Sequence, residues 1–427
     1  MTIRDIVILG AGPCGLSTAI ALAKSSSASP QSQPLRITVI ELRPCIQTIG
    51  GTINITPLGM RYLDYLGAGD KIRQKSISLD SGIDVISLRL GWRLANTWGG
   101  IGARRIARHP LVENMLATLL ENHSDVVTIQ WGRHVTAISE TDAKVVMEFN
   151  DQSTLQCDLL LGCDGIHSMA RRLYVEPERN MVYTGRSVAM GWVKDINRDK
   201  AGAHSAPITL PNGSPALRDT AALRKDGAVM VATYYEPSRR NVFLAHVLWV
   251  KEGEIGHRDG WKVSAEHHDV VTRQILQSYQ GGKVKGFEEL ISKSESWQFY
   301  PINSLPPGGR WRRGRVFLLG DAAHAMQPQG ESTGISIEDG VLMARVLERR
   351  NSRSLEQMLS DYEAVRRKVV DKHVKRAQRI ARFGFFNHSG ILSLILEGVT
   401  AVVMFFMTLY QEDHFAGDVR TLELPQS

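Results

Sequence analysis

Three glycines near the start of the chain, Gly10, Gly12 and Gly15 in the stretch "GAGPCG", have a spacing with recognisable chemistry. Gly10 allows a tight turn after a strand, Gly12 lets the backbone approach a pyrophosphate, and Gly15 lets the next helix pack on that strand. The helix N-terminus offers unpaired N–H groups and partial positive charge to the anion. Glu41 ends the following strand, where its carboxylate can accept both hydroxyls of a ribose. The pattern predicts a bound dinucleotide and does not separate FAD from NAD.

Two further carboxylates stand where apolar strands end. In "GCDGIHS", Asp164 ends a strand and Gly165 allows the turn into a helix, although a simple helix cap would give the same pattern. In "RVFLLGDAAHAMQPQG", Asp321 is expected at the carboxyl edge of the sheet, where ligands bind in open α/β folds. A helix from about Ser332 would point its positive end at a reduced isoalloxazine ring. FAD is long enough to reach both the glycine turn and Asp321, so we expect FAD.

The elements that must position these residues follow an α/β pattern. "DIVILG" and "LRITVIE" read as buried parallel strands joined by a helix, and the polar insert "SSSASPQSQP" (Ser25–Pro34) reads as a loop. "CDLLLGCDG" reads as another buried strand, with a helix in "IHSMARRLY". From about Tyr183 to Trp297 the segments become β-rich and turn-separated, which is typical of an antiparallel sheet.

We therefore expect a Rossmann-like FAD-binding domain with an inserted, mostly antiparallel β-sheet substrate domain and a helical C-terminal tail. The predicted FAD-binding parts are residues 1–76, 100–182 and 298–350. Residues 77–99 form a substrate-side segment, residues 183–297 the substrate domain, and residues 351–427 the C-terminal helices.

Composition and residue spacing indicate which partners, metal sites and location to expect. The chain has 427 residues, 43% of them apolar and 22% charged, with a net charge of +7. Its basic residues are scattered except in "WRRGR" and "RRKVVDKHVKRAQRIAR", and a solvated helix face explains the second, so we expect no nucleic-acid partner. The four cysteines lack metal-ligand spacing, which predicts reduced thiols and no metal site. The chain opens without a secretory signal pattern, and we expect a cytoplasmic protein.

The segment "GILSLILEGVTAVVMFFMTLY" (Gly390–Tyr410) is 21 residues long and carries one charge, Glu397. Its length approaches that of a membrane span, but a glutamate in mid-span is costly in lipid. Two interpretations stay open. The segment is a buried or dimer-forming helix in a monomer or homodimer, or it contacts a membrane surface, for which the preceding basic helix would be suited.

These motifs, over roughly residues 3–350, resemble the single-component (group A) FAD-dependent aromatic hydroxylases, the family of salicylate hydroxylase and kynurenine monooxygenase. The resemblance rests on the glycine motif with Glu41, on "IGGTINITPLGMRYLDYLG", "ARHPLVENML" and "GCDGIHS", and on "GDAAHAMQP…G…EDG". The loop "QGESTG" after Pro328 is shorter and less glycine-rich than in many relatives, and the tail beyond about Arg350 matches poorly.

The resemblance implies roles for particular residues. Asp321 would bind the ribitol, Arg108 the flavin side, and Glu41 the adenosine ribose. Asp164 and Gly165 would serve both FAD and the nicotinamide cofactor, and Gly51 would lie near the flavin. The flavin ring would be lined by Pro328, Gly330 and Gly334.

The resemblance also implies a reaction. NADPH or NADH would bind transiently, since no second GxGxxG occurs, and dioxygen would then give a flavin hydroperoxide that hydroxylates an electron-rich aromatic or phenolic, secondary-metabolite-like compound. Epoxidation of a prenyl or terpenoid alkene is the alternative, and a non-enzymatic FAD-stabilised binding protein is a further one. "GWVKDI" lacks a halogenase motif. His324 is expected to be structural. No catalytic residue is assigned, because the sequence does not choose a substrate base among Tyr183, Arg186, His204, Tyr234, Tyr235 and His246.

Overall fold

A six-stranded sheet forms the centre of the computed structural model, in the order β19-β20-β12-β1-β2-β8. Its neighbours pair in parallel, except the antiparallel β19 and β20. The structure describes residues 3–27, 34–47, 50–198, 202–249, 261–384, 390–409 and 415–426. The strands of this sheet are β1 (Asp5–Leu9), β2 (Arg36–Ile40), β8 (Val127–Gln130), β12 (Leu159–Gly162), β19 (Arg312–Arg313) and β20 (Val316–Leu318).

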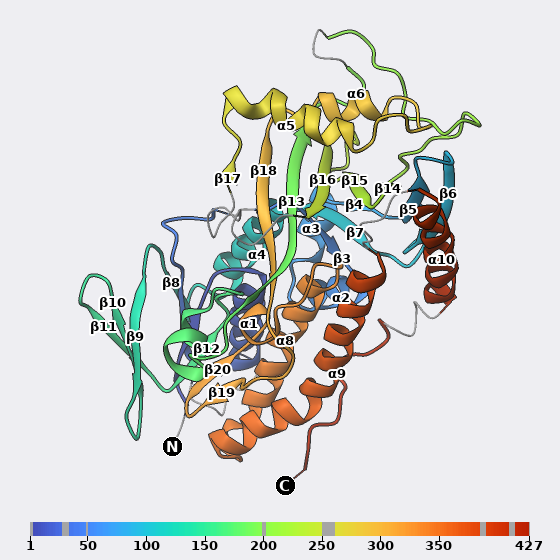
Figure 1. Cartoon of the computed structure of the whole chain (residues 1–427). Coiled ribbons are helices and arrows are strands. Elements are labelled where there is room, and N and C mark those ends of the chain that lie inside the picture. Colours follow the sequence, from blue (N-terminus) through green and yellow to red (C-terminus); the bar gives the residue numbers. More distant parts are fainter. Residues whose placement is uncertain are drawn as a thin grey trace.

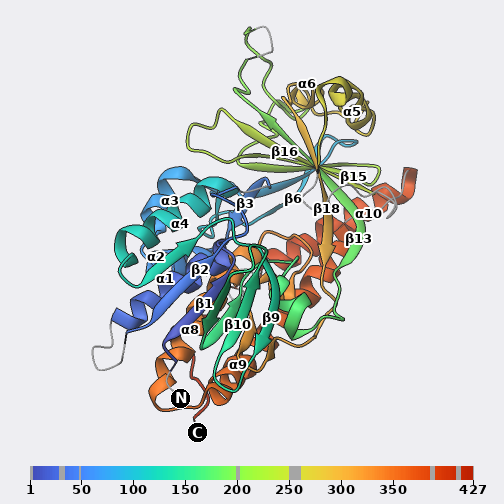
Figure 2. The same ribbon diagram turned by 90° about the vertical axis from the view of Figure 1, so that its left-hand side faces the viewer.

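Layers of helices and strands cover this sheet on both faces. Four of the five residues of β1 are buried, as an apolar strand between two layers must be. Helices α1 (Pro13–Ser27), α4 (Arg108–His123) and α8 (Ser332–Leu347) pack together in one layer. The antiparallel strands β9 (Val135–Glu140), β10 (Val145–Phe149) and β11 (Thr154–Cys157) lie on the other side (Figure 2).

A second sheet of eight strands, the upper sheet, stands above the first (Figure 1). Its strand order is β17-β18-β13-β16-β15-β14-β5-β6. It is antiparallel except between β14 and β5. It has a hydrophobic core of its own, separate from that of the first sheet. Its strands are β5 (Ile83–Ser87), β6 (Trp92–Thr97), β13 (Val182–Val193), β14 (Thr220–Lys225), β15 (Ala228–Tyr234), β16 (Val242–Trp249), β17 (Trp261–Lys262) and β18 (Trp297–Ser304).

The alternation of side chains along these strands separates a cavity face from a core face. On β16, Phe243, Ala245 and Val247 line a cavity, whereas Val242 and Leu244 belong to the second core. Helices α5 (Ala265–Gln277) and α6 (Phe287–Ser292) cover that core on the far side of the sheet. The face of the second sheet that is opposite α5 and α6 therefore lies toward the six-stranded sheet.

The remaining elements connect the two halves. A small sheet of β3 (Thr52–Ile55), β7 (Arg104–Ala107) and β4 (Ile77–Ser78) lies between them, with α2 (Pro57–Tyr65) and α3 (Gly69–Lys75) beside it. After α7 (Asp321–His324) and α8 come a 3₁₀ turn (Glu348–Asn351) and the long helices α9 (Leu355–Gly384) and α10 (Gly390–Leu409). In the described part of the chain, no helix is both long and apolar enough to cross a membrane.

The fold class predicted from the sequence is confirmed, and three local predictions are corrected. The helix expected in "IHSMARRLY" is reduced to one π-helical turn (Arg171–Val175). Helix α1 continues to Ser27, so the predicted loop from Ser25 begins later, and residues 28–33 lie outside the described residues. Helices α5 and α6 were not predicted, because their short amphipathic patterns lie among strongly β-forming segments. The predicted domain boundaries stay a prediction, although β5 and β6 from residues 77–99 do join the second sheet.

Candidate functional site: a cavity between the two sheets

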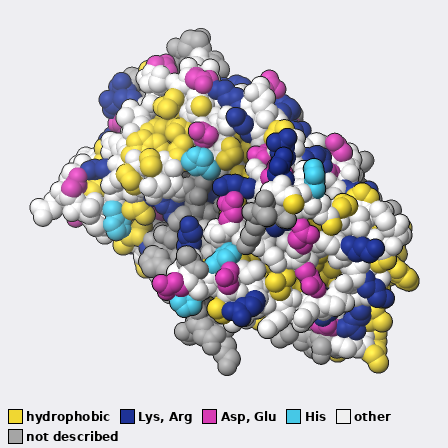
Figure 3. Space-filling view, turned by 90° about the horizontal axis from the view of Figure 1, so that it is seen from above, with side chains coloured by type: hydrophobic (Ala, Val, Ile, Leu, Met, Phe, Trp, Pro, Cys, Tyr) yellow, Lys and Arg dark blue, Asp and Glu magenta, His cyan; other side chains and the backbone are white. Residues whose placement is uncertain are grey.

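One large cavity lies between the two sheets. Its volume is about 2110 Å³, well above the roughly 300–1,000 Å³ of a pocket for a single small ligand, so it can hold two molecules together. Seen from above, the molecular surface is hollowed near its centre, and Lys and Arg side chains lie beside the hollow (Figure 3). The cavity brings together ten of the twelve predicted cofactor residues: Gly10, Gly12, Glu41, Gly51, Arg108, Asp164, Gly165, Asp321, Pro328 and Gly330.

The two other predicted glycines are packing residues. A Cβ on Gly15 would lie 1.8 Å from the carbonyl oxygen of Gly10, so only glycine lets α1 approach β1 this closely, as expected. A Cβ on Gly334 would lie 2.8 Å from Oγ1 of Thr56, because α8 packs closely on α2 there. The residues on its N-terminal side, Ser332 and Thr333, line the cavity in place of Gly334.

The glycine turn leaves open space at the N-terminus of α1. Gly10 has a φ of 107°, and its N–H donates to the carbonyl oxygen of Ile40 at 2.7 Å, which joins the turn to β2. A Cβ on Gly12 would meet no protein atom within 4 Å. The backbone at Gly12 therefore faces the cavity without obstruction, as a pyrophosphate that binds there requires.

Glu41 has a structural role that the sequence did not reveal. Its Oε2 accepts a hydrogen bond from the Ala11 N–H at 2.9 Å, and its Oε1 accepts one from the Arg43 N–H at 3.1 Å. Each carboxylate oxygen keeps a second lone pair, and the residue lines the cavity. Glu41 can therefore hold the glycine turn in place and still accept hydroxyl groups of a ribose.

Asp164 divides its two oxygens between the protein and the cavity. Its Oδ2 accepts hydrogen bonds from the N–H groups of Met169 at 2.5 Å and Ala170 at 3.3 Å, which is the capping role that the sequence left open. Its Oδ1 is buried and has no hydrogen-bond partner among the described residues. Burial raises the pKa of Asp164 despite these hydrogen bonds. A buried polar oxygen at the cavity wall is an acceptor for a bound ligand.

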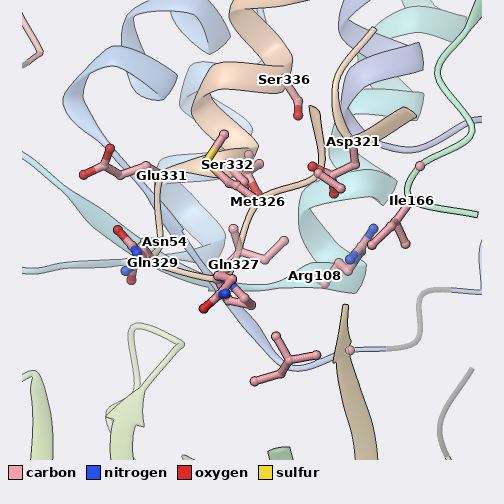
Figure 4. Close-up of a pocket in the computed structure, with 18 of the residues that line it drawn as sticks. Asn54, Arg108, Ile166, Asp321, Met326, Gln327, Gln329, Glu331, Ser332 and Ser336 are labelled. Atoms are coloured by element: carbon pink, nitrogen blue, oxygen red, sulfur yellow. The ribbon is translucent and has the colours of Figure 1, made fainter. Parts of the chain in front are cut away.

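Asp321 and Arg108 face the same space from different elements (Figure 4). Asp321 is the first residue of α7 and Arg108 the first of α4. Burial raises the pKa of Asp321, whereas the nearby His324 and Arg108 act to lower it. The N–H of Arg108 donates to the carbonyl oxygen of Gly51 at 3.1 Å, and so holds β3 beside this pair. The arrangement offers an acceptor and a cation to a polar chain that passes between them.

A buried charge network fixes the start of the loop after β20. Asp339 Oδ2 accepts hydrogen bonds from the Gly320 N–H at 2.9 Å and from His324 Nε2 at 2.7 Å, and its Oδ1 accepts one from Arg366 Nε at 2.6 Å. Arg366 also pairs with Glu338. His324 is 6% exposed and does not line the cavity. Its predicted structural role is confirmed, because it holds the backbone that carries Asp321.

The sequence missed a buried arginine on the substrate side of the cavity. Arg105 on β7 lines the cavity at 7% exposure and donates to the hydroxyls of Thr52 at 3.3 Å and Thr220 at 3.4 Å. Among the described residues no carboxylate lies within 4.0 Å of its guanidinium, and its Nε has no partner. Burial lowers the pKa of Arg105 to about 10, so the group stays charged at neutral pH. Asn54, its neighbour across the β3–β7 pair, presents a buried Oδ1 without a partner.

Of the six candidate substrate bases, the structure brings only Arg186 to the cavity wall. Arg186 donates to Gln327 Oε1 and to the carbonyl oxygen of Ala381, so it contacts the loop that follows Asp321. His246 points to the opposite face of the sheet, where its Nδ1 lies 2.6 Å from the Tyr279 hydroxyl and burial lowers its pKa to about 4. The other four candidates do not line the cavity either: Tyr183, His204, Tyr234 and Tyr235.

These features fit FAD better than any smaller nucleotide. Gly12 offers unobstructed backbone for a pyrophosphate, Glu41 lies where an adenosine ribose would bind, and Asp321 and Arg108 lie further along the same cavity. The loop of Met326, Gln327 and Gln329 faces Asn54 beyond them (Figure 4). One extended ligand can therefore contact the glycine turn and the Asp321 region together, with space left for a second molecule against the upper sheet.

Comparison with known proteins agrees with this geometry. A family model described as "FAD binding domain" matches residues 4–377. Salicylate hydroxylase from Pseudomonas putida is 25% identical over 398 residues, which cover 88% of this chain and 83% of that protein. The chain belongs to the single-component FAD-dependent aromatic hydroxylases. Another similar protein is 6-hydroxynicotinate 3-monooxygenase from Bordetella bronchiseptica, 23% identical with 90% of this chain and 91% of that one covered.

Solved structures show the same fold. The "Salicylate hydroxylase substrate complex" superposes with a TM-score of 0.74 at 18% identity and covers 97% of both chains. Klebsiella pneumoniae HpxO, complexed with FAD and uric acid, superposes with a TM-score of 0.73 at 22% identity and covers 96% of both chains. By its family, the hydroxylase is an FAD-dependent monooxygenase that uses FAD as its cofactor and NADPH or NADH as a transient reductant.

Proposed function

We propose that this hydroxylase acts on an electron-rich phenol that binds as its phenolate beside Arg105. The observation that supports this proposal is a buried guanidinium in the cavity wall with no carboxylate partner among the described residues. A desolvated, unpaired charge is costly, so a fold that retains one is expected to pair it with a ligand of opposite charge.

The surroundings of Arg105 suit an aromatic ring with one ionised oxygen. The upper sheet lines the cavity mainly with apolar side chains, which contact a ring and exclude water: Ile83, Val85, Val188, Met190, Val229, Val231, Phe243, Ala245 and Val247. Within that wall, the hydroxyls of Thr52 and Thr220 hold the guanidinium in place. A phenolate oxygen that approached Arg105 would also come near Asn54.

Arg105 would replace a general base in this mechanism. An opposite charge within about 4–6 Å lowers the pKa of an acid by about 1–3 units, so the guanidinium favours loss of the phenol proton to solvent or to a neighbouring acceptor. The phenolate ring is richer in electrons and more readily attacked. Gly12, Glu41 and Asp321 would hold the FAD, which would supply the oxygen activation when it is reduced.

Paired substrates test the proposal. The purified holoenzyme would be incubated with NADPH and with phenols matched to their O-methyl ethers, which have the same shape and cannot ionise. We expect products heavier by one oxygen from phenols and little product from the ethers. Equal turnover of both would contradict the role of the phenolate.

Epoxidation of a prenyl or terpenoid alkene is the second candidate, and the extent of the apolar wall favours it. A panel of prenylated compounds belongs in the same experiment. A product that carries the new oxygen on the alkene, formed equally by Arg105→Met, would replace the phenol proposal with this one.

A further inference from the structure

Helix α10 has its polar and apolar faces reversed relative to a water-exposed helix. Ser393, Glu397 and Thr400 face the protein and are 6%, 4% and 8% exposed. The apolar side chains face outward, with Ile395 at 57% and Phe405 at 61% exposure, and the other exposed ones are Ile391, Leu392, Leu394, Val399, Val402, Val403 and Phe406. Such a continuous apolar surface exceeds what a monomer in water normally leaves uncovered, which points to a partner or a membrane.

The position of α10 connects this surface to the cavity. The helix packs on β6 at the edge of the upper sheet (Figure 1). Val399, Val403 and Phe406 are exposed and also line the cavity, so they stand at a mouth of it. Val399, Val403 and Phe406 form an apolar rim of the cavity. This rim belongs to the substrate side, because the charge of Glu397 on the same helix acts on Arg224 of β14.

The same cavity has a basic rim on α9. Lys368, Lys372, Lys375 and Arg379 are exposed, line the cavity, and follow one another at helical spacing along one face of α9. In the described part of the chain none of these four side chains has a carboxylate within 4.0 Å. Asp371 is the one acidic residue between Lys368 and Arg379, and it also lines the cavity. We call these four residues the basic stripe.

We propose that α10 and the basic stripe dock this enzyme on an anionic membrane surface, with the mouth of the substrate cavity turned toward the lipid. The apolar face of α10 would lie in the interfacial region without crossing the bilayer, and the basic stripe would meet anionic headgroups. A second copy of the chain fits less well. Two-fold packing through α10 would bring two uncompensated basic stripes toward each other.

Docking has a consequence for the substrate, which rests on the proposed function. Both rims belong to the cavity that holds Arg105, so a lipid-dissolved phenol could pass between α10 and α9 without entering water. The docking itself does not depend on which reaction the enzyme performs. A failure of the phenol assay would therefore not contradict membrane docking. A failure of vesicle binding would not contradict the phenol proposal.

The test is sedimentation of the full-chain holoenzyme with vesicles of phosphatidylcholine alone or mixed with phosphatidylserine. We expect binding to the mixed vesicles that weakens with added salt. The double variant Ile395→Glu/Val402→Glu, at exposed positions outside the cavity lining, should bind at least about tenfold more weakly. The matched control Leu120→Glu/Val270→Glu adds two charges at exposed apolar positions of α4 and α5 and should bind like the parent.

Other results would overturn the proposal. These are a parent that stays in solution with both vesicle types, a double variant that binds as well as the parent, or a dimer that the double variant converts to monomers without any vesicle binding. If the double variant loses FAD, Val402→Cys in a Cys45→Ser background gives a second route, because Cys45 is the exposed cysteine and Cys14, Cys157 and Cys163 are buried. An environment-sensitive label at position 402 should shift to the blue with mixed vesicles, and an unchanged spectrum would contradict docking.

Discussion

Neutralising Arg105 should move the pH dependence of turnover toward higher pH. Arg105 is 7% exposed and has no carboxylate partner among the described residues, so its charge is available to a bound phenolate. An ordinary phenol has a pKa of about 10, and an opposite charge within about 4–6 Å lowers it by about 1–3 units. Each unit raises the phenolate fraction about tenfold at pH values well below the pKa.

For Arg105→Met we therefore expect kcat/KM at pH 7 to fall about 10- to 1000-fold. The alkaline rise of the rate should shift upward by about 1–3 pH units. Because burial lowers the pKa of Arg105 itself to about 10, the guanidinium stays charged over the pH 7–9 range in which the comparison is made. Arg105→Lys keeps a positive charge and should retain most of the parent profile.

The assay is NADPH oxidation and product formation between pH 7 and 9, with flavin content measured for each variant. The flavin content should not change, because Arg105 contacts Thr52 and Thr220 rather than the predicted FAD residues. A methionine variant with the parent pH profile would refute the reasoning. So would a uniform loss of rate at every pH, since that would indicate a packing role alone.

Three further perturbations test the cofactor half. Gly12→Val should fold but lose FAD, because a Cβ there meets no protein atom within 4 Å and only the pyrophosphate space is blocked; flavin absorbance and melting of the apoprotein measure this. Asp321→Ala should weaken FAD retention more than it lowers the melting temperature. Arg366→Met should destabilise the protein by about 3–5 kcal/mol, whereas Arg73→Met, at a pair of exposed side chains, should cost about 0–1 kcal/mol. The Arg366 penalty should shrink as the pH falls below about 4.

The sign of that pH effect follows from Asp339. Burial opposes ionisation of its carboxyl, but the Arg366 charge and the hydrogen bonds from Arg366 and His324 hold the pKa of Asp339 well below its ordinary value. A carboxyl with a depressed folded-state pKa contributes stability above its unfolded pKa and loses it as the pH falls. An Arg366 penalty that stayed constant into acid, a normal flavin yield in Asp321→Ala, or flavin retained by Gly12→Val would each contradict the corresponding assignment.

The sequence predicted which of the cofactor-side residues lie together because their signals are local, and their roles in binding FAD stay predictions. A glycine turn between a strand and a helix, and an aspartate at a strand end, have the same geometry wherever they occur in a parallel sheet. Gly10, Glu41 and Asp321 therefore lie around one cavity as expected, and the structural role predicted for His324 is confirmed by its hydrogen bond to Asp339.

The substrate half was harder to predict because it depends on strand register and burial. In "ARRIAR" the two adjacent arginines must point to opposite sides of β7. Arg105 enters the cavity, whereas Arg104 turns away and bonds to the Ser76 hydroxyl at 2.7 Å, and only the pairing with β3 decides which is which. His246 was a reasonable base by residue type, but the same alternation places it on the core face.

Helix α10 shows the same limit in another form. The segment predicted over Gly390–Tyr410 is a helix over Gly390–Leu409, and Tyr410 lies outside the described residues. Of the interpretations left open, burial of the segment within the chain does not hold, since Ile391 is 78% exposed, whereas the dimer and the membrane contact stay predictions. Its buried polar residues Ser393, Glu397 and Thr400 face the protein, and no periodicity of the helix alone predicts that its apolar face will be left outside.

The most direct test of the central claim is an incubation of the holoenzyme with NADPH, isotopically labelled dioxygen (¹⁸O₂) and a phenol that it turns over. We predict a product that gains one ¹⁸O atom on a ring carbon, at a rate that Arg105→Met reduces at neutral pH. Flavin oxidation that released only hydrogen peroxide, or a product labelled on an alkene carbon and indifferent to Arg105, would contradict the account.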